Sequence, residues 1–431
     1  MSRILCALVL FVAAASACSS SEVPEALSLR DEAVLDEALL DEALLDEAQT
    51  STAAANEIDR SSTSLAMTAS TTDVPTPTTE AVATSTTETT STSTPADAVS
   101  TSAPGDQSAA PSGTGSASAD DMRLYVGALG FYTVDQGLAT SPVAMPTVGK
   151  GIAPLTGLPS SRSTSGAIVV KIDNSPKARP QAGLDVADVV IEQEVEGGIT
   201  RLAAIFQSSA PERIGPVRSA RSTDISFLSA LGRPGLVYSG ANDVFDTLII
   251  GQEQVRNYSA SRFGGYWRDT SRRAPSNLYT SMSQFSMRAT PPPAWFHFGA
   301  GSTNEGAATS SFVVNFPSTS ITWTWNGIGW DRAQDGRNHT SESGAVLQAT
   351  NVVVAQVAVV DSGLKDPTGA VVPEFVWAGE GPAAVFTNGR RIDGRWIRPT
   401  LADPAVLVDA AGGVIELAPG STWVELTRGL P

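Results

Sequence analysis

Cysteine is nearly absent from this 431-residue chain, which contains only Cys6 and Cys18. Cys6 lies in an apolar run, residues 4–17, that follows one basic residue and ends in small residues, as a secretory signal does. Once that signal is removed, Cys18 has no partner, so the mature chain cannot form an internal disulfide. Cysteine-based catalysis and zinc binding by cysteines are excluded as well, and stability must come from a large apolar core.

The apolar run is also short, because a helix needs about 20 apolar residues to span a bilayer. Cys18 directly follows Ala15-Ser16-Ala17, so the segment resembles a bacterial lipobox, in which the signal is cut before a cysteine that then carries a lipid. An ordinary signal peptide cut nearby is the alternative. We therefore predict an exported protein, anchored through a lipid on Cys18 to the extracytoplasmic face of a bacterial cell membrane.

Histidine is equally scarce, and the common catalytic motifs are missing. The sequence has no Gly-x-Ser-x-Gly elbow, no Walker loop, no His-Glu-x-x-His motif and no cysteine cluster. We therefore predict no cofactor and no metal. Of the two histidines, His297 lies between aromatic residues and is expected to pack in the core. His339 lies in a loop and stays a candidate for a site.

Basic residues are few at the N-terminal end. Residues 1–150 hold 5 Lys and Arg against 20 Asp and Glu, whereas residues 151–431 hold 23 against 25. The net charge of -17 therefore belongs mostly to an acidic leader. A nucleic-acid partner is not expected, because phosphate binding needs a basic surface.

Composition divides the chain into five segments. Residues 1–17 are the signal peptide, and residues 18–50 carry a degenerate Asp-Glu-Ala-Leu-Leu repeat that predicts a helical spacer or, alternatively, an acidic partner-binding helix. Residues 51–121 are rich in Ser, Thr, Ala and Pro, which predicts a disordered linker that resembles a wall-crossing or glycosylated stalk. We divide the globular remainder into an N-terminal domain, 122–300, and a mainly β C-terminal domain, 301–431.

The globular part is predicted to have an α+β fold, in which a mixed α/β N-terminal half with a β-hairpin precedes a mainly β C-terminal half. Strands are expected at 167–172, 235–239, 352–360, 383–386 and 422–426. Helices are expected at 222–231 and 243–252. Trp323 and Trp325 precede an Asn-Gly turn and share one strand face, where they either pack against the sheet or form a stacking platform for sugars.

Two β-rich runs flank Gly197-Gly198 and are predicted to form a hairpin with a two-residue turn. That turn places Glu194 opposite Arg201. Side chains alternate between the two faces of a strand, so Arg201 is expected to share one face with three glutamates: Glu192, Glu194 and Glu196. Arg201 can neutralise one or two of these carboxylates, and a cation, a cationic ligand or further arginines must neutralise the rest.

Several motifs in residues 150–431 closely resemble those of the YerB-like bacterial lipoproteins. In the first half they are Pro154-Leu155-Thr156-Gly157, Lys171-Ile172-Asp173-Asn174, Ala178-Arg179-Pro180-Gln181, Val195-Glu196-Gly197-Gly198-Ile199-Thr200-Arg201 and Ile214-Gly215-Pro216-Val217-Arg218-Ser219-Ala220-Arg221. In the second half they are Asn351-Val352-Val353-Val354, Phe386-Thr387-Asn388-Gly389-Arg390, Gly394-Arg395-Trp396 and Pro419-Gly420-Ser421-Thr422-Trp423. The resemblance implies two consecutive domains and a site, but no chemistry for it. The chain departs from the family pattern at Ser276, where relatives tend to carry histidine, and it also lacks a histidine near Val237-Tyr238.

The predicted ligand-binding residues are the polar members of these and neighbouring segments: Asp173, Asn174, Arg179, Gln181, Glu192, Glu196, Thr200, Arg201, Arg218, Arg221, Asp224, Arg268, Asn277, Tyr279 and His339. Arg218 and Arg221 lie at a predicted helix start, which suits an anion or a sugar acid. Alternatively, they pair with Glu192 and Glu196 in a structural network.

Binding of a polar envelope ligand or partner is the predicted function. The alternative is hydrolysis of cell-wall glycan by paired carboxylates, with Asp173, Glu192 or Glu196 as the acid or nucleophile. Hydrolysis requires one carboxylic acid with a raised pKa, whereas nearby arginines keep carboxylates ionised. We therefore favour binding over catalysis, and a purely structural salt-bridge network is the third possibility.

Overall fold

The computed structural model describes residues 124–126, 130–132, 144–250, 255–299, 306–366 and 369–431. The predicted signal peptide, Cys18, the acidic repeat and the Ser/Thr-rich linker lie outside these residues. Within the described ranges, no helix has the length and apolar character needed to cross a bilayer.

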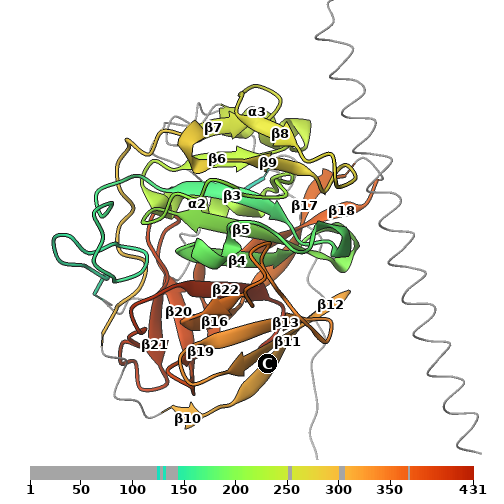
Figure 1. The fold of residues 1–431 in the computed structure, drawn as a ribbon. Coiled ribbons are helices and arrows are strands. Elements are labelled where there is room, and N and C mark those ends of the chain that lie inside the picture. Colours follow the sequence, from blue (N-terminus) through green and yellow to red (C-terminus); the bar gives the residue numbers. More distant parts are fainter. Residues whose placement is uncertain (1–123, 127–129, 133–143, 251–254, 300–305, 367–368) are drawn as a thin grey trace, which may run out of the picture. The chain divides into compact units, whose positions relative to one another are not determined.

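One large mixed sheet contains strands from both halves of the globular part (Figure 1). The N-terminal half contributes β3 (Ile168–Asp173), β4 (Val189–Glu194), β5 (Thr200–Phe206), β6 (Gly235–Tyr238) and β7 (Arg256–Ser259). The C-terminal half contributes β10 (Ala307–Ala308), β16 (Asn351–Gln356), β19 (Gly379–Thr387), β20 (Arg390–Arg398), β21 (Val406–Asp409) and β22 (Thr422–Thr427). Among the described residues, the strand order is β10-β20-β19-β16-β22-β4-β5-β3-β6-β7, with β21 paired to β20.

The last strand joins the two halves. β22 lies between β16 and β4 and runs parallel to both. In this register Trp423 is paired with Val190, and Glu425 is paired with Glu192. A residue near the C-terminus therefore lies beside the hairpin glutamates of the N-terminal half.

Smaller sheets and short helices cover the large sheet. The five-stranded antiparallel sheet is formed by β11 (Ser311–Phe316), β12 (Thr319–Trp325), β13 (Trp330–Gln334), β14 (Arg337–Asn338) and β15 (Gln348–Ala349). Two-stranded ribbons are formed by β1 (Leu124–Val126) with β2 (Gly130–Tyr132), β8 (Tyr266–Arg268) with β9 (Leu278–Thr280), and β17 (Ala358–Lys365) with β18 (Val371–Val376). Among the described residues, the α-helices are α2 (Thr223–Leu228) and α3 (Asp243–Ile250). The short 3-10 turns are η1 (Pro176–Ala178), η2 (Leu184–Val186), η3 (Glu196–Gly198), η4 (Ser229–Leu231) and η5 (Met282–Gln284).

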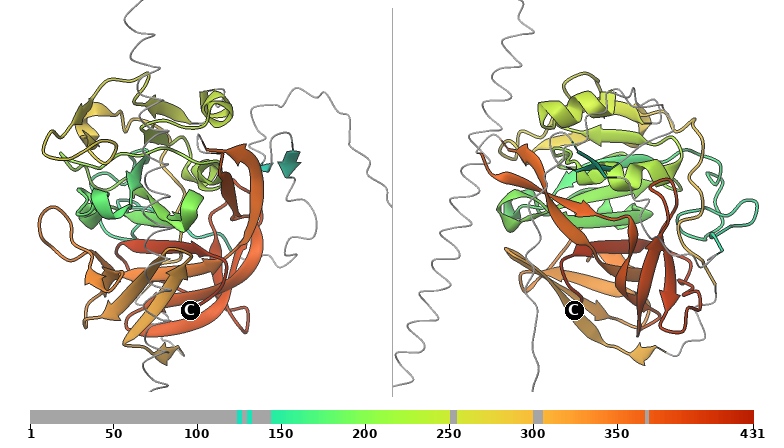
Figure 2. Two further views of the ribbon diagram at one scale, coloured as in Figure 1. Left: turned by 90° about the vertical axis from the view of Figure 1, so that its right-hand side faces the viewer. Right: turned by 180° about the vertical axis from the view of Figure 1, so that it is seen from behind.

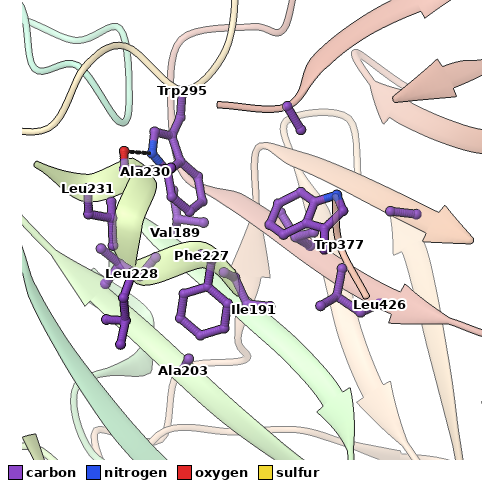
Figure 3. Close-up of a cluster of buried hydrophobic side chains, with 14 of the residues drawn as sticks. Val189, Ile191, Ala203, Phe227, Leu228, Ala230, Leu231, Trp295, Trp377 and Leu426 are labelled. Carbon is purple, nitrogen blue, oxygen red and sulfur yellow. Dashed lines mark hydrogen bonds between the residues drawn. The ribbon is translucent and has the colours of Figure 1, made fainter. Parts of the chain in front are cut away.

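Each face of the large sheet has its own apolar core, because alternate residues of a strand point to opposite sides. On one face, side chains of β4 and β5 pack against α2 (Figure 3), and the same core includes side chains of the β17–β18 ribbon. There the Trp295 indole N–H donates to the Ala230 carbonyl at 2.9 Å. On the other face, the opposite side chains of β3, β4 and β5 belong to one core with side chains of β11, β12 and β13. The backbone of these elements can be followed from two further sides in Figure 2. The large sheet is therefore the middle layer, and each core is a separate environment for polar residues.

The predicted fold class is confirmed, because a mixed sheet with few short helices precedes a mainly antiparallel β region. The expected strands at 167–172 and 422–426 correspond to β3 and β22. Trp323 is fully buried and packs edge-to-face with Trp423 at 5.4 Å between ring centroids. It therefore packs between the sheets and is not available as a stacking platform.

Candidate functional site

The turn of the β4–β5 hairpin is longer than predicted. The Val195 N–H donates to the Ile199 carbonyl at 2.8 Å, so the three residues of η3 form the turn. Both glycines in it have positive φ, 71° at Gly197 and 73° at Gly198, a conformation that glycine adopts without a steric penalty. A three-residue turn therefore replaces the expected two-residue one.

The longer turn shifts the pairing by one residue. Glu194 lies opposite Thr200, and Arg201 lies opposite Gln193. A one-residue shift moves every side chain of one strand to the other face of the sheet relative to its partner strand. The predicted face shared by Arg201, Glu192 and Glu194 is therefore wrong, because Arg201 lies on the opposite face from both glutamates.

Each hairpin glutamate is instead neutralised by an arginine of its own. The ion pairs are Glu192–Arg332 at 2.6 Å, Glu194–Arg428 at 2.9 Å and Glu196–Arg221 at 2.7 Å. Arg332 and Arg428 belong to the C-terminal half, and nothing in the sequence around the hairpin identifies them. The row of repelling carboxylates that the sequence suggested is thus three separate ion pairs.

Glu192 lies at the centre of a buried polar network. One carboxylate oxygen accepts hydrogen bonds from the Thr200 hydroxyl at 2.6 Å and from the Asn174 amide at 3.1 Å. The other oxygen accepts from Arg332 Nη2 at 2.6 Å. The Gln181 amide donates to Asn174 Oδ1 at 3.2 Å. Four predicted site residues are therefore brought together here, with Arg332 as the member that sequence reasoning missed.

His339 connects this network to the surface as a neutral ring. The Gln181 side-chain nitrogen donates to the Asp173 carbonyl and to Asn174 Oδ1, so its oxygen accepts from His339 Nε2 at 2.6 Å. His339 Nδ1 then accepts from Arg332 Nη1. Burial, followed by the positive charge of Arg332, lowers the pKa of His339 well below 6.5. Both ring nitrogens are engaged, so His339 orients its neighbours and has no free nitrogen for proton transfer.

Glu425 is a second carboxyl group in the same network, and sequence reasoning missed it. It is fully buried beside Glu192, and one oxygen accepts from the Trp323 indole N–H at 3.1 Å. Burial and then the Glu192 charge raise the pKa of Glu425 well above 4.5, whereas Arg332 opposes the rise. The second oxygen has no hydrogen-bond donor among the described residues. We infer that Glu425 is protonated and donates to Glu192, because two adjacent buried carboxylates repel unless one carries a proton.

Other predicted residues lie on the opposite face of the sheet. Lys171 and Asp224 form a fully buried ion pair at 2.6 Å, and the second Asp224 oxygen accepts from the Arg221 backbone N–H at 2.9 Å. Burial lowers the pKa of Lys171, and Asp224 opposes that effect. Arg201 donates to the Ser219 carbonyl at 3.1 Å. This cluster ties α2 to the sheet.

Asp173 and Arg218 form a further buried pair at 3.7 Å. Asp173 also accepts hydrogen bonds from the Ser175 backbone N–H at 2.9 Å and from the Ser276 hydroxyl at 2.7 Å. Burial alone would raise the pKa of Asp173, but Arg218 and these hydrogen bonds lower it. Ser276 thus has a hydrogen-bonding role at the position where the family pattern led us to expect histidine.

Three predicted residues form a separate cluster around β8 and β9. Arg268 donates to Asn277 Oδ1 at 2.7 Å. The Tyr279 hydroxyl donates to Glu342 at 2.8 Å, and the Arg213 guanidinium lies 3.7 Å from the centroid of the tyrosine ring. Arg268 and Asn277 bond to each other, Tyr279 bonds to Glu342, and among the described residues no hydrogen bond joins these three side chains to the network around Glu192.

A cavity of about 470 Å³ lies between the η1 loop and the turn that joins β13 to β14. Its walls include Arg179, Gln334, Asp335, Arg337 and His339. We call it the polar cavity. It contains two predicted site residues, Arg179 and His339, and His339 continues inward to Gln181 and Glu192. Its volume is within the range of small-molecule sites, about 300–1,000 Å³.

A smaller cavity of about 220 Å³ lies beside the Glu196–Arg221 pair. Much of its lining is apolar: Ala220, Ala241, Phe245, Leu364 and Val372. Burial alone would raise the pKa of Glu196, but Arg221 overrides this effect and lowers it. Because Arg221 is already bound through two nitrogens to Glu196, this pair offers a ligand little that is unused. Within the described residues, no group of three or more His, Cys, Asp and Glu side chains is placed to hold a metal.

Four residues of the polar cavity and the network behind it, Asn174, Arg179, Gln181 and Thr200, lie in the motifs that resemble the YerB-like lipoproteins. The models of the N-terminal and C-terminal domains of a protein of unknown function, DUF3048, match residues 155–292 and 312–424. The chain therefore belongs to the DUF3048 family, and the resemblance is confirmed.

The YerB protein of Bacillus subtilis agrees with this assignment in both sequence and structure. "Putative lipoprotein YerB" of strain 168 is 36% identical over 155 residues, which cover 32% of this chain and 43% of that protein. The aligned part thus spans less than half the length of that relative. The crystal structure of the YerB protein matches with a TM-score of 0.53 at 28% identity, covering 65% of this chain and 97% of the crystallised chain.

Proposed function

We propose that this protein is an exported lipoprotein, anchored by a lipid on Cys18, that binds a polar ligand of the cell envelope in the polar cavity. The lipobox-like segment and the lipoprotein name of the Bacillus subtilis relative support the anchor. The linker of residues 51–121 then separates the globular part from the membrane surface. The binding role is supported by the cavity and the network behind it.

One observation carries the binding role. A continuous chain of buried polar groups, Glu192, Arg332 and His339, leads from the core to the cavity wall, and Gln181 holds His339 from behind. Burying ionised groups is costly even when they are paired, and apolar side chains of similar volume are often at least as stabilising. A buried network that ends at a cavity therefore indicates a binding site more than a device for stability.

Carboxylate-dependent hydrolysis of cell-wall glycan is the second candidate, and Glu425 is the observation in its favour. A protonated carboxylic acid beside an ionised one is the pair that such chemistry requires. Both Glu192 and Glu425 are fully buried, however, and the oxygens of Glu192 are already engaged. A glycosidic bond cannot reach either group in this conformation, so binding is the better-supported function.

A thermal-shift panel of soluble cell-wall fragments, sugars and sugar acids tests the proposal on the full-length protein. A ligand of the polar cavity should raise the melting temperature, and Arg179→Gln should abolish that increase. Arg288→Gln is the matched control, because Arg288 is an exposed arginine. It lies next to Met287, whose backbone carbonyl accepts a hydrogen bond from the Gly166 N–H just before β3. If stabilising fragments act equally on both variants, the ligand binds elsewhere. If no fragment acts, the network is structural.

A further inference from the structure

Positively charged side chains outnumber negatively charged ones in the lining of the polar cavity. Its lining contains two guanidinium groups, Arg179 and Arg337, and one carboxylate, Asp335. His339 contributes no charge, because its pKa lies well below 6.5. Behind His339, the charge of Arg332 is matched by Glu192 at 2.6 Å. The cavity wall therefore carries a net positive charge.

Asp335 balances one of the two guanidinium charges, and it is shared between Arg179 and β12. Its Oδ1 accepts from the Thr319 hydroxyl at 2.7 Å and from the Ser320 backbone N–H at 3.1 Å. Its Oδ2 contacts both terminal nitrogens of Arg179 at 3.4 Å, which is longer than the 2.7–2.9 Å typical of a charge-assisted hydrogen bond. Asp335 is thus held mainly by the start of β12, and its contacts with Arg179 are the longer ones.

Arg179 is fixed in place but incompletely bonded. Arg272 donates to the carbonyls of Ala178 and Pro180, at 2.9 and 2.7 Å, and so anchors the backbone on both sides of Arg179. The Nε atom of Arg179 is buried and has no hydrogen-bond partner among the described residues. Burial lowers the pKa of Arg179, against the effect of Asp335. The buried Nε cannot reach a ligand, but the two terminal nitrogens bond only to Asp335 among the described residues, at 3.4 Å each, and so retain hydrogen-bonding capacity.

Arg337 provides a second positive group on the β13–β14 side of the cavity. It follows the Asp335-Gly336 turn, whose φ values of 52° and 73° are those of a tight hairpin turn. Its side chain is exposed and makes no hydrogen bond or ion pair with any described residue. A ligand in the cavity would thus meet one anchored guanidinium and one uncommitted guanidinium.

From this charge balance, and resting on the binding role proposed above, we propose that the polar cavity takes an acidic sugar, in which a carboxylate or phosphate is bound by Arg179 and Arg337. Guanidinium groups bind both anions through paired N–H donors. A volume of about 470 Å³ exceeds that of a lone phosphate ion and accommodates a sugar ring beside the anion. The exposed Asn338 side chain, which also lines the cavity, then provides an amide for the sugar hydroxyls.

Titration calorimetry of the full-length protein with four sugars of one ring size tests the charge requirement. The ligands are glucose, glucosamine, glucuronate and glucose 1-phosphate, and inorganic phosphate is the fifth probe. Glucuronate and glucose 1-phosphate should bind, with affinity that falls as sodium chloride is raised, whereas glucose and glucosamine should bind at least tenfold more weakly. Inorganic phosphate should compete but bind more weakly than glucose 1-phosphate.

Variants locate the anion. Arg337→Gln should raise the dissociation constant of glucuronate at least tenfold. It should not change the melting temperature of the free protein, because the Arg337 side chain is exposed. Arg179→Lys keeps the charge but loses the paired donors, so it should weaken binding as well, and Arg288→Gln should not. If glucuronate binds equally to all variants, the anion site is elsewhere and the inference is wrong.

The remaining outcomes separate this inference from the proposed function. Equal or tighter binding of glucose or glucosamine in the cavity would refute the anion requirement and leave the binding role intact. Failure of all five probes, together with failure of the wall-fragment panel, would refute both. Vesicles containing phosphatidylglycerol identify the source of the anion: if they bind through Arg337 and the acidic sugars do not, the ligand is a lipid headgroup and the acidic-sugar assignment is overturned.

Discussion

Glu374 tests how burial raises the pKa of a carboxyl group in this protein and thereby makes stability depend on pH. It lies in β18, is fully buried, and has no hydrogen-bond donor at normal distance among the described residues. Burial raises the pKa of Glu374 from 4.5 to about 7, and the Ser222 hydroxyl opposes only part of that rise. The folded state therefore favours the protonated acid and is destabilised when the group ionises.

The magnitude follows from linkage between protonation and folding. One pKa unit corresponds to about 1.4 kcal/mol, so a rise from 4.5 to about 7 makes ionised Glu374 cost the fold about 3 kcal/mol. Because the pKa of Glu374 is higher in the folded state, the protonated side chain stabilises the fold relative to the ionised one, and this stabilisation is fully present below pH 4.5. It is lost as the pH rises through about 7.

Glu374→Gln removes the ionisation and keeps the side-chain shape. Urea denaturation should find the variant more stable relative to the parent at pH 8 than at pH 4, by about 3 kcal/mol in the free energy of unfolding. Glu212→Gln, at an exposed carboxylate, is the matched control and should show little pH-dependent difference. A Glu374→Gln effect that is the same at both pH values would refute the reasoning, since it would mean that the native protein ionises this group without cost.

Three further predictions concern the network and the anchor. Arg332→Ala leaves Glu192 buried without its ion pair, so urea denaturation should show a loss of about 3–5 kcal/mol; a loss below about 1 kcal/mol would mean that water replaces the guanidinium. Glu425→Gln should change stability at pH 7 by less than about 1 kcal/mol, because the group is already protonated and the amide can donate to Glu192 in its place. Glu192→Gln should be several-fold more destabilising in the same assay, and the reverse order would place the proton on Glu192. Cys18→Ser should move the protein from the membrane fraction to the soluble exported fraction, and retention on the membrane would argue against a lipid at Cys18.

The hairpin shows where sequence reasoning was sufficient and where it failed. The two β-rich runs and the glycines between them were enough to predict two paired strands, because strand propensity and turn formation depend on neighbouring residues. They were not enough to distinguish a two-residue turn from a three-residue one, since both can use Gly197 and Gly198. The one-residue difference in turn length decides whether Arg201 faces the glutamates. In the structure Arg201 lies on the other face of the sheet.

Sequence reasoning identified only some residues of the candidate site, for a related reason. Asn174, Gln181, Thr200 and His339 were named from polar motifs, and the structure brings them together around Glu192. The role of His339 as a neutral, fully bonded ring depends on Arg332, which is fixed by the packing of β13 against the large sheet. No local pattern signals such a contact.

The sequence by itself determined the α+β character of the globular part, its main strands and helices, the hairpin and the family. These depend on periodicity, propensity and motifs that lie within short stretches of chain. The tertiary structure alone decided that Arg332 and Arg428 neutralise Glu192 and Glu194, and that a second carboxyl group, Glu425, lies beside Glu192. Those outcomes depend on β22, which inserts between β4 and β16 and places Glu425 beside Glu192. Electrostatic partners are set by distance in space and by burial, so residues far apart in sequence could be matched only once the sheet was assembled.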